Sequence, residues 1–271
     1  MAKVWAKKGT PKKLRLIEKK SGNLHLMRYF IEFAYDGAPY FGYQVQPNQI
    51  SVQETLEKAL STLLRQPIKT TGAGRTDTGV HAKKIFAHFD FEGELMDNLV
   101  HRLNSFLPES IAIKRIFEVE SDAHARFSAT YRTYNYFIST EKDPFTKDLA
   151  WQLWRKKLDV DAMNEACKIL FEYSDFTSFA KLHTDNKTNI CKIYQANWEQ
   201  NGSLLKFTVS ADRFLRNMVR AIVGTMIEVG DGKLEPEDMH RVITEQHRNS
   251  AGTSAPAHGL FLVDVGYDFL D

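Results

Sequence analysis

The chain has 271 residues, of which 43% are hydrophobic and 12% aromatic, and its formal net charge is +2. This length fits one large or two medium domains, and the apolar and aromatic content excludes a disordered chain. No apolar run approaches the roughly 20 residues of a membrane-spanning helix, and the N-terminus lacks the apolar segment of a signal peptide, so we expect a cytoplasmic protein without a membrane partner.

The charge is unevenly distributed along the chain. Residues 1–20 hold eight Lys or Arg and one Glu, for a net charge of +7, and the remaining 251 residues hold 28 basic and 33 acidic residues, net −5. We interpret residues 1–27 as a basic tail that is either simply solvated or an auxiliary arm for phosphate contacts. The two cysteines, Cys167 and Cys191, lie far apart and outside any C-x-x-C, so they indicate neither a disulfide framework nor a zinc site.

Six elements are predicted in the first half of the chain. The alternating, aromatic-rich stretch RYFIEFAY (28–35) is typical of a strand. A helix follows, because Ser51 and Glu54 have capping-box spacing and apolar residues recur at helical intervals from Val52 to Leu63. The other four are a short extended piece, a strand, a helix and a strand, at 68–71, 85–91, 96–107 and 111–119.

The second half repeats this order. Its expected elements are a strand, a helix, two paired strands, a long helix, an extra helix that starts on Pro236, and a final strand, with the others at 131–139, 161–173, 190–198, 204–210, 214–229 and 259–267. Strand, helix, strand, strand, helix, strand is the split βαβ signature. We therefore predict an α+β fold of two ferredoxin-like (RRM-like) halves, residues 28–128 and 129–271, with abutting, largely antiparallel sheets and helices on the outer faces.

The stretch TGAGRTDTGVHA (71–82) is the densest polar motif in the chain. It is not a P-loop, because Val80 and His81 stand where Lys and Ser or Thr are required, and it is not a dinucleotide fingerprint, because Asp77 stands where the third glycine belongs. A metal site would need Asp77, His81 and His88 to converge, with no further ligand nearby in sequence. Two readings remain: a loop that presents the Asp77 carboxylate, or a turn in which Asp77 bonds its own backbone.

The stretch GRTDTGVHA resembles the G-R-T-D-A-G-V-H-A signature of the bacterial tRNA pseudouridine synthase A family, with Thr78 in place of Ala. Further motifs that resemble the family follow in order over nearly all of residues 28–267: YDGAPYFGYQVQP, SVQETLEKAL, LNSFLPESIAI, HARFSATYRTYNYFI, DFTSF, FLRNMVRAIVGTMIEVG and GLFLVDVGY. The resemblance implies two ferredoxin-like halves, a homodimer, no cofactor and no metal. It also implies isomerisation of uridine to pseudouridine in the anticodon arm of tRNA, at expected positions 38–40.

The resemblance also implies roles for five residues. Asp77 would be the essential carboxylate beside the glycosidic bond, either attacking the sugar or abstracting a proton, and Arg220 would pair with it. Tyr134 would stack on the target uracil and assist proton transfer, and Leu260 would close the uracil pocket. Arg75 would lie at the RNA and help to extrude the uridine; from the sequence alone, a structural pair with a nearby acid is the alternative for Arg75.

Some alternatives stay open at the level of sequence. Arg213 and Arg216, at the start of the long predicted helix, belong either to a solvated face or to a phosphate-binding stripe. The chain departs from the family pattern at Ile85, Val45 and Cys191, which leaves the set of target uridines open. A catalytically silent RNA-binding protein and a metal-dependent hydrolase are the rival classes of function. The presence of the implied catalytic residues Asp77, Tyr134 and Arg220 and the small number of metal ligands favour the synthase.

Overall fold

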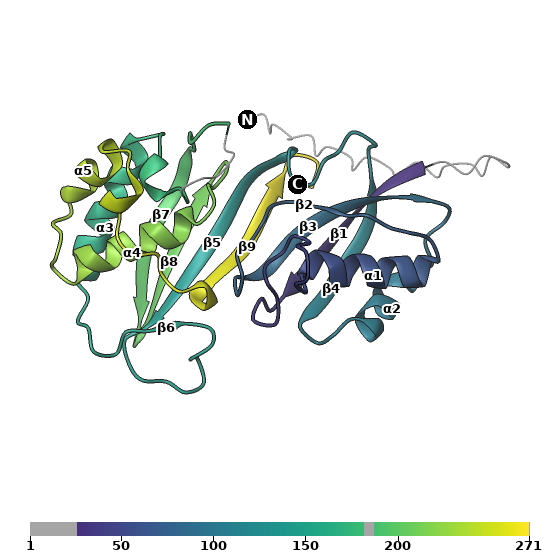
Figure 1. Ribbon diagram of the computed structural model, residues 1–271, viewed down its shortest axis with the longest axis horizontal. Coiled ribbons are helices and arrows are strands. Elements are labelled where there is room, and N and C mark those ends of the chain that lie inside the picture. Colours follow the sequence, from purple (N-terminus) through teal and green to yellow (C-terminus); the bar gives the residue numbers. More distant parts are fainter. Residues whose placement is uncertain (1–25, 182–186, 271) are drawn as a thin grey trace, which may run out of the picture.

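The computed structural model of the chain describes residues 26–181 and 187–270. The predicted basic tail lies outside the described residues except for its last two, which open the first strand. Within the described part, nine strands form one sheet (Figure 1): β1 (Leu26–Tyr35), β2 (Thr71–Gly72), β3 (His81–Glu92), β4 (Ile111–Val119), β5 (Ala129–Ser139), β6 (Trp151–Gln152), β7 (Ile193–Asn201), β8 (Leu204–Ala211) and β9 (Leu260–Tyr267). Five α-helices accompany it there: α1 (Val52–Leu64), α2 (Leu99–Phe106), α3 (Val160–Ile169), α4 (Met218–Gly230) and α5 (Asp238–Thr244).

The strand order is β4-β1-β3-β9-β5-β8-β7, with β2 beside β3 and β6 beside β5. The prediction was two abutting sheets, whereas the structure has one mostly antiparallel sheet. The two halves join where β3 and β9 run parallel, with His81 and Ala82 opposite Phe261 and Leu262. This junction is possible because β2 is only two residues long and pairs with β3 farther along, at Ala87 and His88, which leaves the start of β3 open to β9.

The first half packs α1 and α2 against β1, β3 and β4 (Figure 1). Helix α1 begins where the capping box predicts, since the Ser51 hydroxyl accepts from the Glu54 amide at 3.2 Å. Its apolar stripe, including Leu56 and Leu60, is fully buried. The core of this half also contains side chains from β9, the last strand of the chain: Leu262, Val265 and Tyr267.

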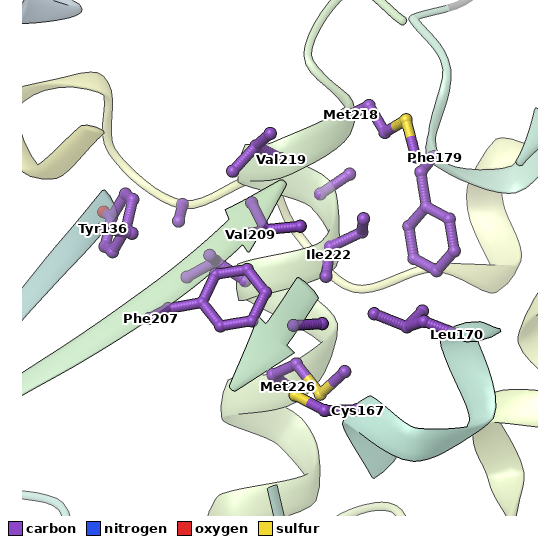
Figure 2. Close-up of a cluster of buried hydrophobic side chains, with 14 of the residues drawn as sticks. Tyr136, Cys167, Leu170, Phe179, Phe207, Val209, Met218, Val219, Ile222 and Met226 are labelled. Atoms are coloured by element: carbon purple, nitrogen blue, oxygen red, sulfur yellow. The ribbon is translucent and has the colours of Figure 1, made fainter. Parts of the chain in front are cut away.

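The second half packs α3, α4 and α5 against β5, β7 and β8. Helix α4 is buried on nearly all sides. This is expected from its largely apolar sequence, MVRAIVGTMIEVG. Figure 2 shows α4 side chains close to strand and helix partners; those labelled are Tyr136, Cys167, Leu170, Phe179, Phe207, Val209, Met218, Val219, Ile222 and Met226. Both cysteines are buried and free, as the sequence predicts.

Several predicted elements have different ends in the structure, and two of these differences bear on the site. Helix α4 begins at Met218 rather than Phe214, because Asn217 has a left-handed backbone (φ 68°) that stops the helix on its N-terminal side. Strand β3 begins at His81, four residues earlier than predicted, and this shortens the glycine-rich loop to residues 73–80. Strand β6 was not predicted. Among the described residues, we find no helix with the length and hydropathy to cross a membrane.

Candidate active site

The glycine-rich loop, residues 73–80, connects β2 to β3 and is attached to the sheet at its start. The Ala73 amide donates to the Phe86 carbonyl at 2.8 Å. Near its end, the Val80 amide donates to the Asp77 carbonyl at 3.1 Å, which closes a turn with Asp77 at its first position. The loop is therefore a tight turn that displays the Asp77 side chain.

The middle of the loop rests on the segment that follows β1. The Thr76 hydroxyl shares a hydrogen bond with the Tyr35 hydroxyl at 2.8 Å, and the Thr76 carbonyl accepts from the Tyr43 amide at 3.3 Å. This approach requires glycine at position 42, where φ is 95° and a Cβ would lie 2.7 Å from the Thr76 oxygen. Asp77 is thus positioned from both sides of the loop.

Two arginines of the second half reach the Asp77 carboxylate. Arg220 Nη1 lies 3.3 Å from Asp77 Oδ2, and Arg216 Nε lies 3.7 Å from Oδ1. The Asp77 and Arg220 side chains are 25% and 21% exposed, so the pair is largely shielded but open to solvent on one side. Arg216 is more exposed, and it belongs to the loop before α4 rather than to the predicted helical stripe. Within residues 26–181 and 187–270, the Arg213 side chain has no such contact with a carboxylate.

Arg220 is fixed by a backbone segment that lies along α4. Its Nε donates to the Ala255 carbonyl at 2.7 Å, and its own carbonyl accepts from the Ala255 amide at 2.9 Å. The segment lies this close because position 224 is glycine: a Cβ there would be 1.8 Å from the Thr253 oxygen. Glycine inside α4 therefore serves the placement of the guanidinium beside Asp77.

Tyr134 lies on β5 at the junction of the two cores and is packed against both. Its ring meets Phe214 edge to face, with centroids 5.3 Å apart. Burial raises the pKa of Tyr134 to about 12, Arg132 opposes the rise, and the Asp77 carboxylate adds to it. The phenol is therefore neutral at physiological pH, so it can stack or donate a proton but does not act as a phenolate base.

Of the other predicted site residues, Leu260 is buried and Arg75 is exposed. Leu260 is buried at the start of β9, in the same cluster as Val80 at the end of the loop, opposite Tyr136. Tyr136 is a core residue, and its hydroxyl donates to the Pro256 carbonyl. Arg75 is exposed at the loop surface, and no acidic partner is recorded for it among residues 26–181 and 187–270, so the alternative of a structural pair has no support there.

Arg132 is a site residue that the sequence analysis missed. Its guanidinium lies inside the junction and donates to four backbone carbonyls, at 2.6 to 3.1 Å: Arg126, Asp212, Ala129 and Ala73. It thereby joins the start of the glycine-rich loop to β5 and to the loop that carries Arg216. A signal was present in the sequence, because Arg132 shares its strand phase with the aromatic residues Tyr134 and Tyr136, and a charged residue is unusual on such a face.

The two histidines near the motif do not converge with Asp77. His81 Nε2 lies 3.1 Å from the His258 carbonyl and its Nδ1 lies 2.9 Å from Asp36, while His88 Nδ1 accepts from the Ala125 amide at 3.1 Å. In the described part of the chain, no group of three His, Cys, Asp or Glu side chains is arranged to hold a metal ion. What the site offers chemically is one carboxylate, a paired guanidinium and a neutral phenol.

Comparisons with known proteins agree on one family. A profile described as tRNA pseudouridine synthase matches residues 166–268. The chain is 55% identical over 247 residues to tRNA pseudouridine synthase A of Bacteroides fragilis, covering 90% of this chain and 98% of the relative. It is 54% identical over 244 residues to the Parabacteroides distasonis protein of the same name (89% and 96% covered) and 38% identical over 247 residues to that of Bacillus subtilis (89% and 100% covered). The chain belongs to the tRNA pseudouridine synthase A family.

Proposed function

We propose that the chain isomerises uridine to pseudouridine in tRNA, with Asp77 as the residue that acts at the ribose. The observation that carries the proposal is the Asp77 carboxylate, presented by a tight loop of one half and held by Arg220 of the other. In this reaction the C1′–N1 bond breaks, the uracil turns, and a C1′–C5 bond forms; C5 loses its proton and N1 gains one. The balance needs no oxidant, water or cofactor, and an ionised carboxylate is a competent nucleophile.

The remaining residues have supporting roles in this proposal. Arg220 orients the carboxylate through their hydrogen-bonded contact. Tyr134 stacks on the uracil as a neutral phenol, and Leu260 closes the pocket around the detached base. Arg75, exposed beside the loop, contacts the RNA and helps to extrude the uridine, which costs a few kcal/mol of stacking and pairing. Arg216 contributes a second positive charge that can serve either Asp77 or an RNA phosphate.

The finer features of the proposal are these. The substrate is the anticodon arm, with uridines 38–40 as targets, and one tRNA lies across a homodimer in the cytoplasm. No metal or small-molecule cofactor takes part. The chain consists of a basic tail (1–27) and two ferredoxin-like halves, residues 28–128 and 129–271; the strand order β4-β1-β3-β2 in one and β9-β5-β8-β7 in the other supports this division, because both follow the same 4-1-3-2 pattern.

Conversion of uridine in an unmodified tRNA tests the proposal. Wild-type protein, incubated without added metal or nucleotide, is expected to form pseudouridine in the anticodon arm. Asp77→Asn removes the nucleophile and keeps its shape, so conversion should fall by about 10⁴-fold or more while tRNA affinity and thermal unfolding stay near those of the wild type. Positions are read by pseudouridine mapping.

Asp97→Asn is the matched control, since Asp97 is an exposed residue before α2 and far in sequence from the loop. It should convert tRNA at the wild-type rate. Activity retained by Asp77→Asn would reject Asp77 as the acting residue, and a wild-type protein that binds tRNA but converts no uridine would reject the synthase activity. Pseudouridine outside positions 38–40 would reject only the target assignment.

A further inference from the structure

Phe127 lies on the turn that connects the two halves of the chain, and 76% of its surface is exposed to solvent. A single exposed Phe is unremarkable by itself, but this ring has an arginine and a histidine ring as neighbours. The Arg126 guanidinium carbon lies 5.5 Å from the Phe127 ring centroid, and the His124 ring centroid lies 4.4 Å away. By contrast, Phe145 is 92% exposed, and no cation is recorded over its ring within the described residues.

The turn that carries Phe127 is held rigidly. His124 Nδ1 accepts from the amides of both Arg126 and Phe127, at 3.1 and 3.2 Å. The turn is closed by two bonds between His124 and Ser128, since the His124 amide donates to the Ser128 hydroxyl and the Ser128 amide donates to the His124 carbonyl, both at 2.9 Å. The backbone that carries the ring is therefore ordered before binding, which lowers the entropy cost of a contact there.

The same turn is attached to the core and to the candidate active site. Ala125 donates its amide to His88, and its carbonyl accepts from the Tyr267 hydroxyl. One nitrogen of Arg132, Nη2, donates both to the Arg126 carbonyl at 2.6 Å and to the Ala73 carbonyl at 3.1 Å. The backbone beside Phe127 and the start of the glycine-rich loop thus share a single donor atom.

Two exposed arginines lie close in sequence to these contacts: Arg126 is next to the ring, and Arg75 follows two residues after Ala73. The acidic residues Glu120 and Asp122 precede the turn and line a pocket with Ser128. Basic side chains that interleave with exposed aromatic rings are characteristic of surfaces that bind single-stranded nucleic acid, where the cations follow the phosphates and the rings stack on unpaired bases. A partner protein would bury the ring among apolar atoms, whereas here its nearest neighbours are charged or polar.

We infer that Phe127 is a stacking platform for an unpaired base of the substrate tRNA, a base adjacent to the uridine that is modified. The inference rests on the proposed function and adds a contact outside the residues that act on the uridine itself. When the target uridine leaves its stack, a neighbouring base loses a stacking partner. The Phe127 ring replaces that partner and so lowers the cost of extrusion.

Binding and turnover of three variants test the inference. Phe127→Ala should weaken binding of unmodified tRNA and lower kcat/KM by about ten-fold, the effect of losing one base–aromatic stack. Phe127→Trp should stay close to the wild type, because it keeps an aromatic face. Phe145→Ala should match the wild type in binding and turnover. Thermal unfolding of Phe127→Ala should be unchanged, since the ring is outside the core.

A second measurement identifies the base. A set of tRNAs, each with one abasic nucleotide in the anticodon loop, is bound by wild type and by Phe127→Ala. At one position the abasic change should weaken binding to the wild type but not to the variant, which is the non-additivity of a direct contact. Additive losses at every position, or unchanged affinity of Phe127→Ala, would overturn the inference.

The outcomes separate the inference from the proposed function. If wild type forms no pseudouridine, the synthase proposal fails while the abasic series still decides whether Phe127 stacks on a base. If wild type forms pseudouridine and Phe127→Ala is indistinguishable from it, only the inference fails. If Phe127→Ala instead changes the oligomeric mass in native mass spectrometry, the ring belongs to a contact between copies of the chain, and the inference is wrong.

Discussion

His88 is a buried imidazole with a lowered pKa. Burial, reinforced by the nearby Arg28 guanidinium and His124, lowers the pKa of His88 to about 4. An unfolded histidine titrates near 6.5, so between pH 6.5 and 4 the unfolded chain binds a proton that the folded chain does not. The free energy of unfolding should therefore fall as the pH is lowered through this range, by up to roughly 3 kcal/mol from this group.

His88→Asn keeps an acceptor for the Ala125 amide but removes the titration. Urea unfolding at pH 7.0 and 4.5 should show a smaller loss of stability at low pH for this variant than for the wild type. The exposed His101, on α2, provides the control, because His101→Asn should leave the pH dependence as it is. Equal slopes for the wild type and His88→Asn would mean that another group causes the acid sensitivity.

The role of a single residue could be predicted where the residue lies in a recognisable motif. It could not be predicted where the role depends on contacts with residues far away in the sequence. The glycine-rich motif singled out Asp77, but its contacts with Arg216 and Arg220 span 139 and 143 residues of sequence, which no spacing rule reveals. The resemblance to the family supplied the pairing with Arg220; it did not supply Arg216. Arg132 was missed although its strand phase offered a signal, because the backbone carbonyls that its guanidinium binds have no signature in the sequence.

At the scale of elements, the contact between α4 and the segment 251–255 depends on Gly224. Gly224→Ala would place a Cβ 1.8 Å from the Thr253 oxygen, so the segment must move and Arg220 must lose its bond to Ala255. We expect a loss of stability of about 1–3 kcal/mol, as for other overpacked sites. A larger fractional loss in kcat than in tRNA affinity should accompany it, because Arg220 is displaced from Asp77.

Unfolding in urea and single-turnover conversion measure the two effects of Gly224→Ala separately. A variant with reduced stability and normal kcat would show that Arg220 does not depend on the segment. Normal stability and normal kcat would show that α4 and the segment 251–255 can separate enough to accommodate the added methyl group.

The elements themselves were largely predictable, and their ends were less so. The strand at 111–119 has the predicted bounds, and α1 begins beside its predicted cap, because alternation and capping are local signals. The predicted start of α4 was wrong. The apolar spacing of the sequence continues across Asn217, but the left-handed backbone of Asn217 interrupts the helix there. The β3–β9 pair was not predicted, because two strands so far apart leave no common local pattern.

At the scale of the whole molecule, the first half depends on the end of the chain. Tyr267, from β9, lies edge to face with Phe30 and Phe86, with centroids 5.3 and 5.2 Å apart. A fragment of residues 26–128 lacks this cover and would expose both rings. We expect the fragment to lack a cooperative thermal transition, and to gain one when residues 129–271 are co-expressed with it.

Near-UV circular dichroism and thermal melting of the fragment, alone and with its complement, measure this dependence. Full-length protein with Tyr267→Ala should show a partial loss of stability, of about 3–5 kcal/mol, as for other large-to-small changes in a core. A fragment that melts cooperatively by itself would show that the first half is an autonomous domain.

The position of β9 also has a consequence for synthesis on the ribosome. Residues of the first half leave the exit tunnel early, yet the strand that covers part of their core is among the last to be made. During translation, part of the apolar core of the nascent first half therefore stays exposed until β9 has been made. The loop of Asp77 can contact Arg220 only after α4 has been made, late in synthesis. In the proposed mechanism, the order of these elements along the chain delays activity until α4 and β9 have been made.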